Sequence, residues 1–240
     1  MQAQVGLIGG TGVGSLLAGL PGRSVFVPTE YGVVRGRLVD MASRSVFVLS
    51  RHSAGHSVPP HLVNYRGMAT ALKSLGVSHC FATAAVGSLK PDLEIGSFLV
   101  CSDFIDFTNR NLTLYDRGVV HTPFPVAFGA SSRAALLEGA KSANASVKDG
   151  GVYIGLNGPR FETPQEIQLL AQFGDVVGMT AASEAIVMKE AGVEYGLMAI
   201  VTNMGEGIGG AVEHELVGKE MKQKGPEALA IIEKAIGVLS

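Results

Sequence analysis

Two kinds of apolar pattern alternate along the chain. Short runs rich in β-branched and aromatic residues predict strands, and longer stretches with apolar residues near i, i+3 and i+4 predict helices. The predicted strands begin near Val5, Ser45, His79, Gly96, Gly151, Asp175 and Tyr195. The predicted helices cover residues 63–75, 131–143, 164–173, 182–191 and 226–238. This alternation is typical of an α/β fold, in which helices cover a β-sheet.

Residues near the ends of the predicted helices support these boundaries. Thr163 offers a hydroxyl that can cap a helix, and Pro164 follows it at the first helical position. Gly76 and Gly192 come just after predicted helix ends, where glycine readily closes a helix. The sequence therefore predicts where these helices begin and end, as well as that they exist.

Length and composition favour a single domain. The chain has 240 residues, of which 47% are hydrophobic, so it can bury a substantial core. The sequence contains no internal repeat and no low-complexity linker. We therefore expect one domain that spans residues 1–240.

Charge and cysteine content argue against several classes of protein. The formal net charge is −2 and no basic block occurs, so we expect neither a nucleic acid nor an anionic membrane as partner. Cys80 and Cys101 are the two cysteines and form no CxxC pair, which argues against a zinc site or a disulfide framework. No apolar run approaches the roughly 18 residues of a membrane span. The first ten residues, MQAQVGLIGG, lack the basic region of a signal peptide. We expect a cytoplasmic protein with a small ligand.

Groups that can bind an anion follow three of the predicted strands. Gly9–Gly12 comes directly after the first strand, where glycines let backbone N–H groups approach an anion. Arg51 and His52 follow the strand from Ser45, and a guanidinium there could bind a phosphate through two hydrogen bonds. Thr83–Ser88 is a third strand end that runs into small residues. An ordinary turn or a surface arginine explains each feature alone, but together they predict one phosphate site at a sheet edge.

The most specific motifs lie in the second half of the chain. They are Gly158–Thr163 (GPRFET), Gly178–Thr180 (GMT) followed by Ser183 and Glu184, and Thr202–Asn203. With the Gly9–Gly12 loop, in order and spacing, they resemble the trimeric purine nucleoside phosphorylase and methylthioadenosine phosphorylase family, over nearly the whole chain. The resemblance implies a single domain with a central mixed β-sheet flanked by helices. It also implies an enzyme that splits a purine nucleoside with inorganic phosphate.

The resemblance further implies which residues bind phosphate and sugar. Phosphate would be held by Thr11, Arg51, His52, the backbone at Ala85 and the hydroxyl of Thr180. Met179 would lie along the ribose and Phe161 against the purine. Some members of the family have a threonine where this chain has Ala84, so one hydrogen bond to phosphate is absent here or supplied by another group.

Glu162 and Asn203 stand at the positions that bind the leaving base in the 6-oxopurine enzymes of the family. A carboxylate at Glu162 would accept the N1–H of hypoxanthine or guanine. The amide of Asn203 would donate to O6 and accept from a protonated N7, whereas adenine-specific relatives carry aspartate at this position. A mismatched base would leave buried polar groups unpaired. With Thr180, these residues form the candidate catalytic set, and they favour inosine- or guanosine-type substrates.

Two histidines extend the resemblance beyond the base and the phosphate. His214 resembles the histidine that contacts the 5′-hydroxyl in nucleoside-specific members, whereas members that accept a 5′-methylthio group tend to place apolar residues there. His121 resembles a residue that lines the pocket of the neighbouring subunit. The resemblance therefore implies a homotrimer, and it leaves a hexamer open.

The main interpretation is a pentosyltransferase of purine salvage that acts on inosine or guanosine, with phosphate as co-substrate and with no metal or organic cofactor. One alternative is S-methyl-5′-thioinosine phosphorylase; S-methyl-5′-thioadenosine phosphorylase is disfavoured by Asn203. A hydrolase that uses water is disfavoured by the several phosphate-directed groups. A non-catalytic nucleoside-binding protein would not need to keep both Arg51 and Glu162.

Overall fold

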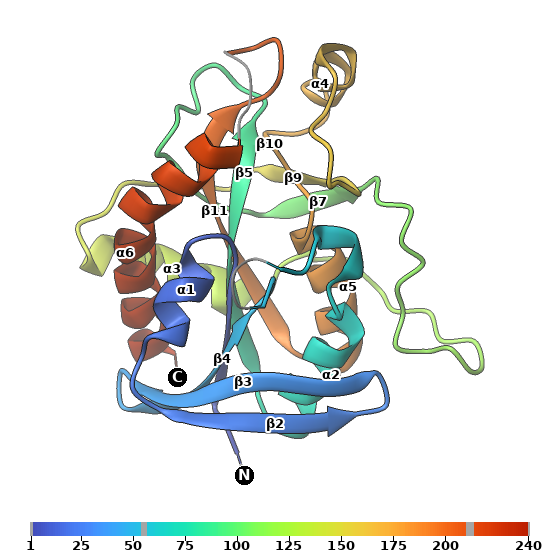
Figure 1. Cartoon of the computed structure of the whole chain (residues 1–240), viewed down its shortest axis with the longest axis vertical. Helices are drawn as coiled ribbons and strands as arrows, with labels where there is room; N and C mark the ends of the chain where they lie inside the picture. Colours follow the sequence, from blue (N-terminus) through green and yellow to red (C-terminus); the bar gives the residue numbers. More distant parts are fainter. Residues whose placement is uncertain (1, 54–56, 210–213, 240) are drawn as a thin grey trace.

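The fold is built on a mixed β-sheet with helices on both faces (Figure 1). The computed structural model describes residues 2–53, 57–209 and 214–239. Its strands are β1 (Val5–Gly9), β2 (Arg23–Thr29), β3 (Gly32–Met41), β4 (Arg44–Ser50), β5 (His79–Ser88), β6 (Phe98–Val100), β7 (Asp103–Asp106), β8 (Val147–Asp149), β9 (Val152–Gly155), β10 (Val176–Gly178) and β11 (Glu194–Met204). Its α-helices are α1 (Val13–Ala18), α2 (Tyr65–Ser74), α3 (Ala130–Ser142), α4 (Pro164–Leu170), α5 (Ala181–Ala191) and α6 (His214–Val238).

The middle of the sheet is parallel. β5 pairs with β1 and with β11, and β1 pairs with β4, all in parallel. The carboxyl ends of these strands therefore meet at one edge of the sheet, as is usual for ligand sites in α/β folds. β10 joins the last two residues of β5 in antiparallel fashion, and β2, β3 and β4 form an antiparallel extension on the other side. The predicted mixed sheet is confirmed.

Each face of the sheet is covered by its own set of helices. α2 and α5 pack on one face, where Leu72 and Val187 are fully buried. α1, α3 and α6 pack on the other face, which buries Leu17, Leu136 and Ile231 (Figure 1). Because close-packed apolar layers hold the strands on both sides, the side chains at the strand ends have fixed positions. No helix within the described ranges is long and apolar enough to cross a membrane.

The predicted helices are confirmed, with one correction. α2, α3, α4 and α5 lie within a few residues of their predicted ranges. The last helix, predicted from Pro226, begins at His214, so Pro226 lies inside it. Proline usually interrupts a helix because it lacks the N–H. Here Met221 and Ile231, on either side of it, are buried in the same apolar cluster, so packing sustains the longer helix.

The predicted strands are also present, but the sheet contains further strands that the sequence did not predict. The run from Gly96 forms two strands, β6 and β7, instead of one. The β2–β3 hairpin, β8 and α1 were not predicted. β2 shows the alternating burial of an amphipathic strand, with Val25 and Val27 inward. Its Pro28 disfavours a strand in sequence, yet β2 lies at the end of the strand order, where proline is tolerated.

The helix ends follow the capping chemistry that the sequence predicts. The Thr163 hydroxyl accepts from the Glu166 N–H at 3.2 Å, and the Glu166 carboxylate accepts from the Thr163 N–H at 2.7 Å, which together form a capping box. Gly192 closes α5 with φ of 76°, a left-handed conformation that glycine adopts without strain. The capping box fixes the start of α4 directly after the GPRFET loop.

Candidate active site

A cavity of about 350 Å³ opens at the edge where the carboxyl ends of the parallel strands meet. Its walls come from the loops after β1 and β4, from β5, from the turn between β10 and α5, from the end of β11 and from the GPRFET loop. The structure brings most of the predicted site residues together there: Thr11, Arg51, His52, Ala85, Phe161, Glu162, Met179, Thr180 and Asn203. The cavity is therefore the candidate active site.

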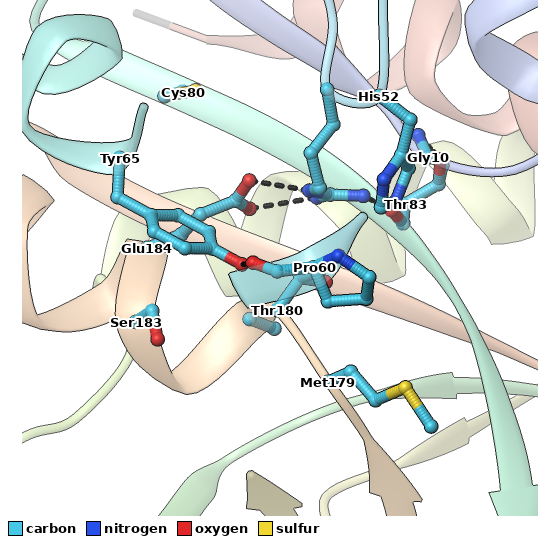
Figure 2. Close-up of polar contacts among 12 residues, drawn as sticks. Gly10, His52, Pro60, Tyr65, Cys80, Thr83, Met179, Thr180, Ser183 and Glu184 are labelled. Atoms are coloured by element: carbon cyan, nitrogen blue, oxygen red, sulfur yellow. Dashed lines mark hydrogen bonds and ion pairs between the residues drawn. The ribbon is translucent and has the colours of Figure 1, made fainter. Parts of the chain in front are cut away.

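Arg51 is buried in the lining of the cavity and paired with a carboxylate. Its Nε donates to Glu184 at 2.5 Å and its Nη2 donates to the second Glu184 oxygen at 2.7 Å (Figure 2). The Arg51 Nη1 donates to the Thr83 carbonyl at 2.9 Å. The sequence suggested that Arg51 would use two such bonds on phosphate, but in the structure Glu184 holds that side of the guanidinium. Arg51 faces the cavity with its remaining surface.

The Arg51 guanidinium stays charged although it is buried. Burial alone would lower the pKa of the Arg51 guanidinium, but the charge and hydrogen bonds of Glu184 outweigh it and raise that pKa. Tyr195 donates a further hydrogen bond to Glu184 at 2.5 Å. Glu184 belongs to one of the motifs found in the sequence, but its pairing with Arg51 could not be predicted, because the two residues are 133 positions apart.

The glycine motif after β1 is explained by the space that Arg51 needs. A Cβ atom on Gly10 would lie 2.6 Å from the Arg51 Nη1 and 2.7 Å from the Thr83 carbonyl oxygen. The Gly10 N–H donates to the Thr83 hydroxyl at 3.2 Å. The ring of His52 is oriented by the contact between its Nδ1 and the Val58 carbonyl at 2.8 Å. The residues that follow β1 and β4, together with Thr83 of β5, thus pack around the Arg51 guanidinium.

The lining of the cavity also includes a carboxylate, Glu162, and an amide, Asn203. The Asn203 Oδ1 accepts from the Thr202 hydroxyl at 3.1 Å, and its Nδ2 donates to the Met204 carbonyl at 3.1 Å. Each of these atoms keeps capacity for a second hydrogen bond. Glu162 is half-buried on the GPRFET loop, and burial raises the pKa of its carboxyl above the usual range. The amide and the carboxylate can together recognise the polar edge of a planar ring.

The raised pKa of Glu162 predicts a gain in stability when its charge is removed. Because the folded-state pKa lies above the unfolded-state value, folding stability falls as the pH rises through that interval. Glu162→Gln is expected to raise the unfolding midpoint at neutral pH, on the order of 2 °C. The gain should vanish near the ordinary carboxyl pKa of about 4. Thermal unfolding at both pH values checks this, with exposed Glu138→Gln as the control. An unchanged or lower midpoint at neutral pH contradicts it.

One predicted residue, His121, is not among the residues that line the cavity. His121 is exposed on the segment between β7 and α3. His214 is the first residue of α6, but its side chain lies outside the described residues. Val217, three positions further along α6, does line the cavity and was not predicted. Because the sequence predicted this helix only from Pro226, it did not indicate that Val217 is helical or which way its side chain faces.

Comparisons with known proteins place the chain in a family. The pattern that defines the phosphorylase superfamily matches residues 4–237, and the chain belongs to this superfamily. It is 38% identical to the probable S-methyl-5′-thioinosine phosphorylase of Methanopyrus kandleri, over 98% of this chain and 92% of that protein. It is 36% identical to the 6-oxopurine nucleoside phosphorylase of Pyrococcus furiosus, over 98% of this chain and 93% of that protein.

Solved structures give the same result for the fold. Methylthioadenosine phosphorylase from Schistosoma mansoni in complex with adenine superimposes with a TM-score of 0.89 at 30% sequence identity, covering 100% of this chain and 93% of that chain. A methylthioadenosine phosphorylase from an Antarctic soil metagenomic library gives a TM-score of 0.89 at 28% identity, covering 99% of this chain and 86% of that chain. The chain is therefore similar to enzymes that are named for different substrates: 6-oxopurine nucleosides, S-methyl-5′-thioinosine and methylthioadenosine. These substrates differ in the base and at the 5′ position of the sugar, so the residues of the site are needed to distinguish between them.

Proposed function

We propose that this protein cleaves the N-glycosidic bond of inosine- and guanosine-type nucleosides with phosphate, releasing hypoxanthine or guanine and (deoxy)ribose 1-phosphate. The observation that carries the proposal is that one cavity is lined by buried Arg51 and also by Glu162 and Asn203. A cation there suits phosphate, and an amide beside a carboxylate suits a 6-oxopurine. The reaction needs no metal or organic cofactor, because phosphate itself is the nucleophile.

In the proposed reaction, a phosphate oxygen attacks C1′ of the sugar on the face opposite the purine. The C1′–N9 bond breaks, its electron pair moves into the purine, which takes up a proton from solvent at N7, and the sugar passes through an oxocarbenium-like state. Asn203 stabilises the departing base by donating to O6 and accepting from N7–H, while Glu162 accepts N1–H. Arg51, Thr11, His52 and Thr180 hold the phosphate, so catalysis is mainly positioning and electrostatic stabilisation.

One observation favours a second candidate, S-methyl-5′-thioinosine. Val217 places an apolar, buried side chain of α6 in the cavity wall. An apolar wall suits a methylthio group better than a hydroxyl, since a buried hydroxyl needs a hydrogen-bond partner. The base-binding residues would be the same for both substrates, so the two candidates differ only at the 5′ end.

Base release from inosine, S-methyl-5′-thioinosine and S-methyl-5′-thioadenosine, each with phosphate, tests the proposal. We expect release of hypoxanthine from both S-methyl-5′-thioinosine and inosine. The kcat/KM for S-methyl-5′-thioinosine divided by the kcat/KM for inosine decides the preference at the 5′ end. A ratio above one supports the second candidate, and a ratio below one supports inosine. Faster release of adenine than of hypoxanthine would overturn the role proposed for Asn203.

We also propose a homotrimer in the cytoplasm that acts in purine salvage.

A further inference from the structure

Arg110 joins four separate parts of the structure beside the cavity without lining it. It lies on the segment between β7 and α3. Its Nη1 donates to the Met179 carbonyl at 2.8 Å, to the Ser183 hydroxyl at 2.9 Å and to the Tyr65 hydroxyl at 3.1 Å. Its Nη2 donates to the Asn157 carbonyl at 2.7 Å. All four acceptors are uncharged oxygens, so this cation acts as a connector of backbone and hydroxyl groups.

The contact with Met179 fixes one wall of the cavity. The Met179 carbonyl and the Thr180 N–H belong to the same peptide group. Arg110 binds the carbonyl, and the Tyr153 hydroxyl accepts from the Thr180 N–H at 3.1 Å. A peptide group held at both ends cannot rotate, so the directions in which the Met179 and Thr180 side chains leave the backbone are fixed. Figure 2 shows the side chains of Met179 and Thr180.

The contact with Asn157 fixes a second part of the wall. Asn157 begins the loop that presents Phe161 and Glu162 to the cavity. This loop also touches the first wall, because a Cβ atom on Gly158 would lie 2.4 Å from the Met179 sulfur. Arg110 therefore ties the part of the lining that carries Met179 to the part that carries Phe161, the two residues expected to contact the sugar and the base.

Tyr65 connects Arg110 to a third part of the cavity lining. The guanidinium of Arg110 lies over the Tyr65 ring, 5.2 Å from its centroid, and the Tyr65 hydroxyl donates to the Pro60 carbonyl at 2.6 Å. Pro60 lines the cavity (Figure 2). Arg110 therefore reaches a third part of the lining through Tyr65, in addition to the parts that carry Met179 and Phe161.

We propose that Arg110 is a positioning residue for the nucleoside: it sets the separation of the parts of the lining that carry Met179 and Phe161. This rests on the proposed function. Misplacing reacting groups by about 1 Å lowers rates about a hundredfold. Arg110→Met is therefore expected to raise KM for the nucleoside about tenfold or more and to lower kcat/KM about a hundredfold. The KM for phosphate should stay within about twofold, because Tyr153 still holds the Thr180 N–H.

The matched control is Arg133→Met. Arg133 is also partly buried, donates to the Cys101 carbonyl at 2.9 Å and pairs with Asp149 at 2.5 Å, but it lies on α3 away from the cavity. Arg110→Lys is the second variant, because one ammonium group cannot bridge Met179 and Asn157 as a planar guanidinium does. It should fold and show an intermediate rise in nucleoside KM.

Steady-state kinetics with inosine and phosphate, and calorimetric titration of each variant with inosine, give the readout. We expect Arg110→Met to weaken inosine binding about tenfold, and Arg133→Met to leave it within about twofold. Equal inosine binding in wild type and both Arg110 variants would overturn the proposal, as would an equal loss in Arg133→Met. The titration needs no turnover, so failure of the wild type to release base would count against the proposed function alone.

Discussion

Replacing Glu184 with glutamine is expected to lower the free energy of unfolding by about 3 kcal/mol or more, because it leaves the Arg51 guanidinium buried without its counter-ion. For a chain of this size, that loss shifts the unfolding midpoint by on the order of 10 °C. Phosphate should stabilise the variant more than it stabilises the wild type, since a bound anion then becomes the partner of Arg51. Thermal unfolding with and without phosphate measures both effects.

The control for this prediction is a similar ion pair at the surface. Arg160 pairs with Glu166 through two hydrogen bonds of 2.7 and 2.8 Å, and the Glu166 carboxyl has a pKa lowered to about 2 by Arg160. Because solvent screens this exposed pair, Glu166→Gln should change the midpoint little. A Glu184→Gln variant as stable as Glu166→Gln, or one that phosphate does not stabilise, would contradict the role given to the Arg51–Glu184 pair.

Replacing Asn203 with aspartate is expected to lower the preference for inosine over adenosine by about ten- to a hundredfold, equivalent to one buried polar group left unpaired. The asparagine amide can donate to O6 of a 6-oxopurine, whereas a carboxylate only accepts and therefore suits a 6-amino group. Asn203 Nδ2 also loses its bond to the Met204 carbonyl in the variant. The ratio of kcat/KM values for inosine and adenosine measures the change.

Asn144→Asp serves as the control for the Asn203 variant. It makes the same chemical change on an exposed side chain that does not line the cavity. Its selectivity should match that of the wild type. If Asn203→Asp kept the wild-type ratio of inosine to adenosine, the amide of Asn203 would not be what recognises the base.

Much of the fold could be predicted because its elements carry local signals. β1, β5 and β11 are continuous apolar runs, as expected for strands buried on both faces. Thr163 and Pro164 mark the start of α4 through capping chemistry that needs only four adjacent residues. The start of α6 could not be predicted, because Pro226 opposes a helix locally and packing against α1, α3 and the sheet sustains it.

The site was predictable where its residues stand at strand ends. Parallel strands bring Gly10, Arg51 and Asn203 to one edge, whatever the details of packing. What those residues bind within the protein was not predictable. The pairing of Arg51 with Glu184 and the contacts of Arg110 join positions far apart in the sequence, and no local pattern marks either partner. The sequence therefore indicates which groups meet, and the structure shows how they are held.

The most direct test of the central claim is to incubate the wild-type protein with inosine, with and without phosphate, and to identify both products. We predict that hypoxanthine and ribose 1-phosphate form in equal amounts and only when phosphate is present. Hypoxanthine with free ribose at the same rate in both conditions would show a hydrolase. Binding of inosine without any base release from it or from S-methyl-5′-thioinosine would contradict an enzymatic role.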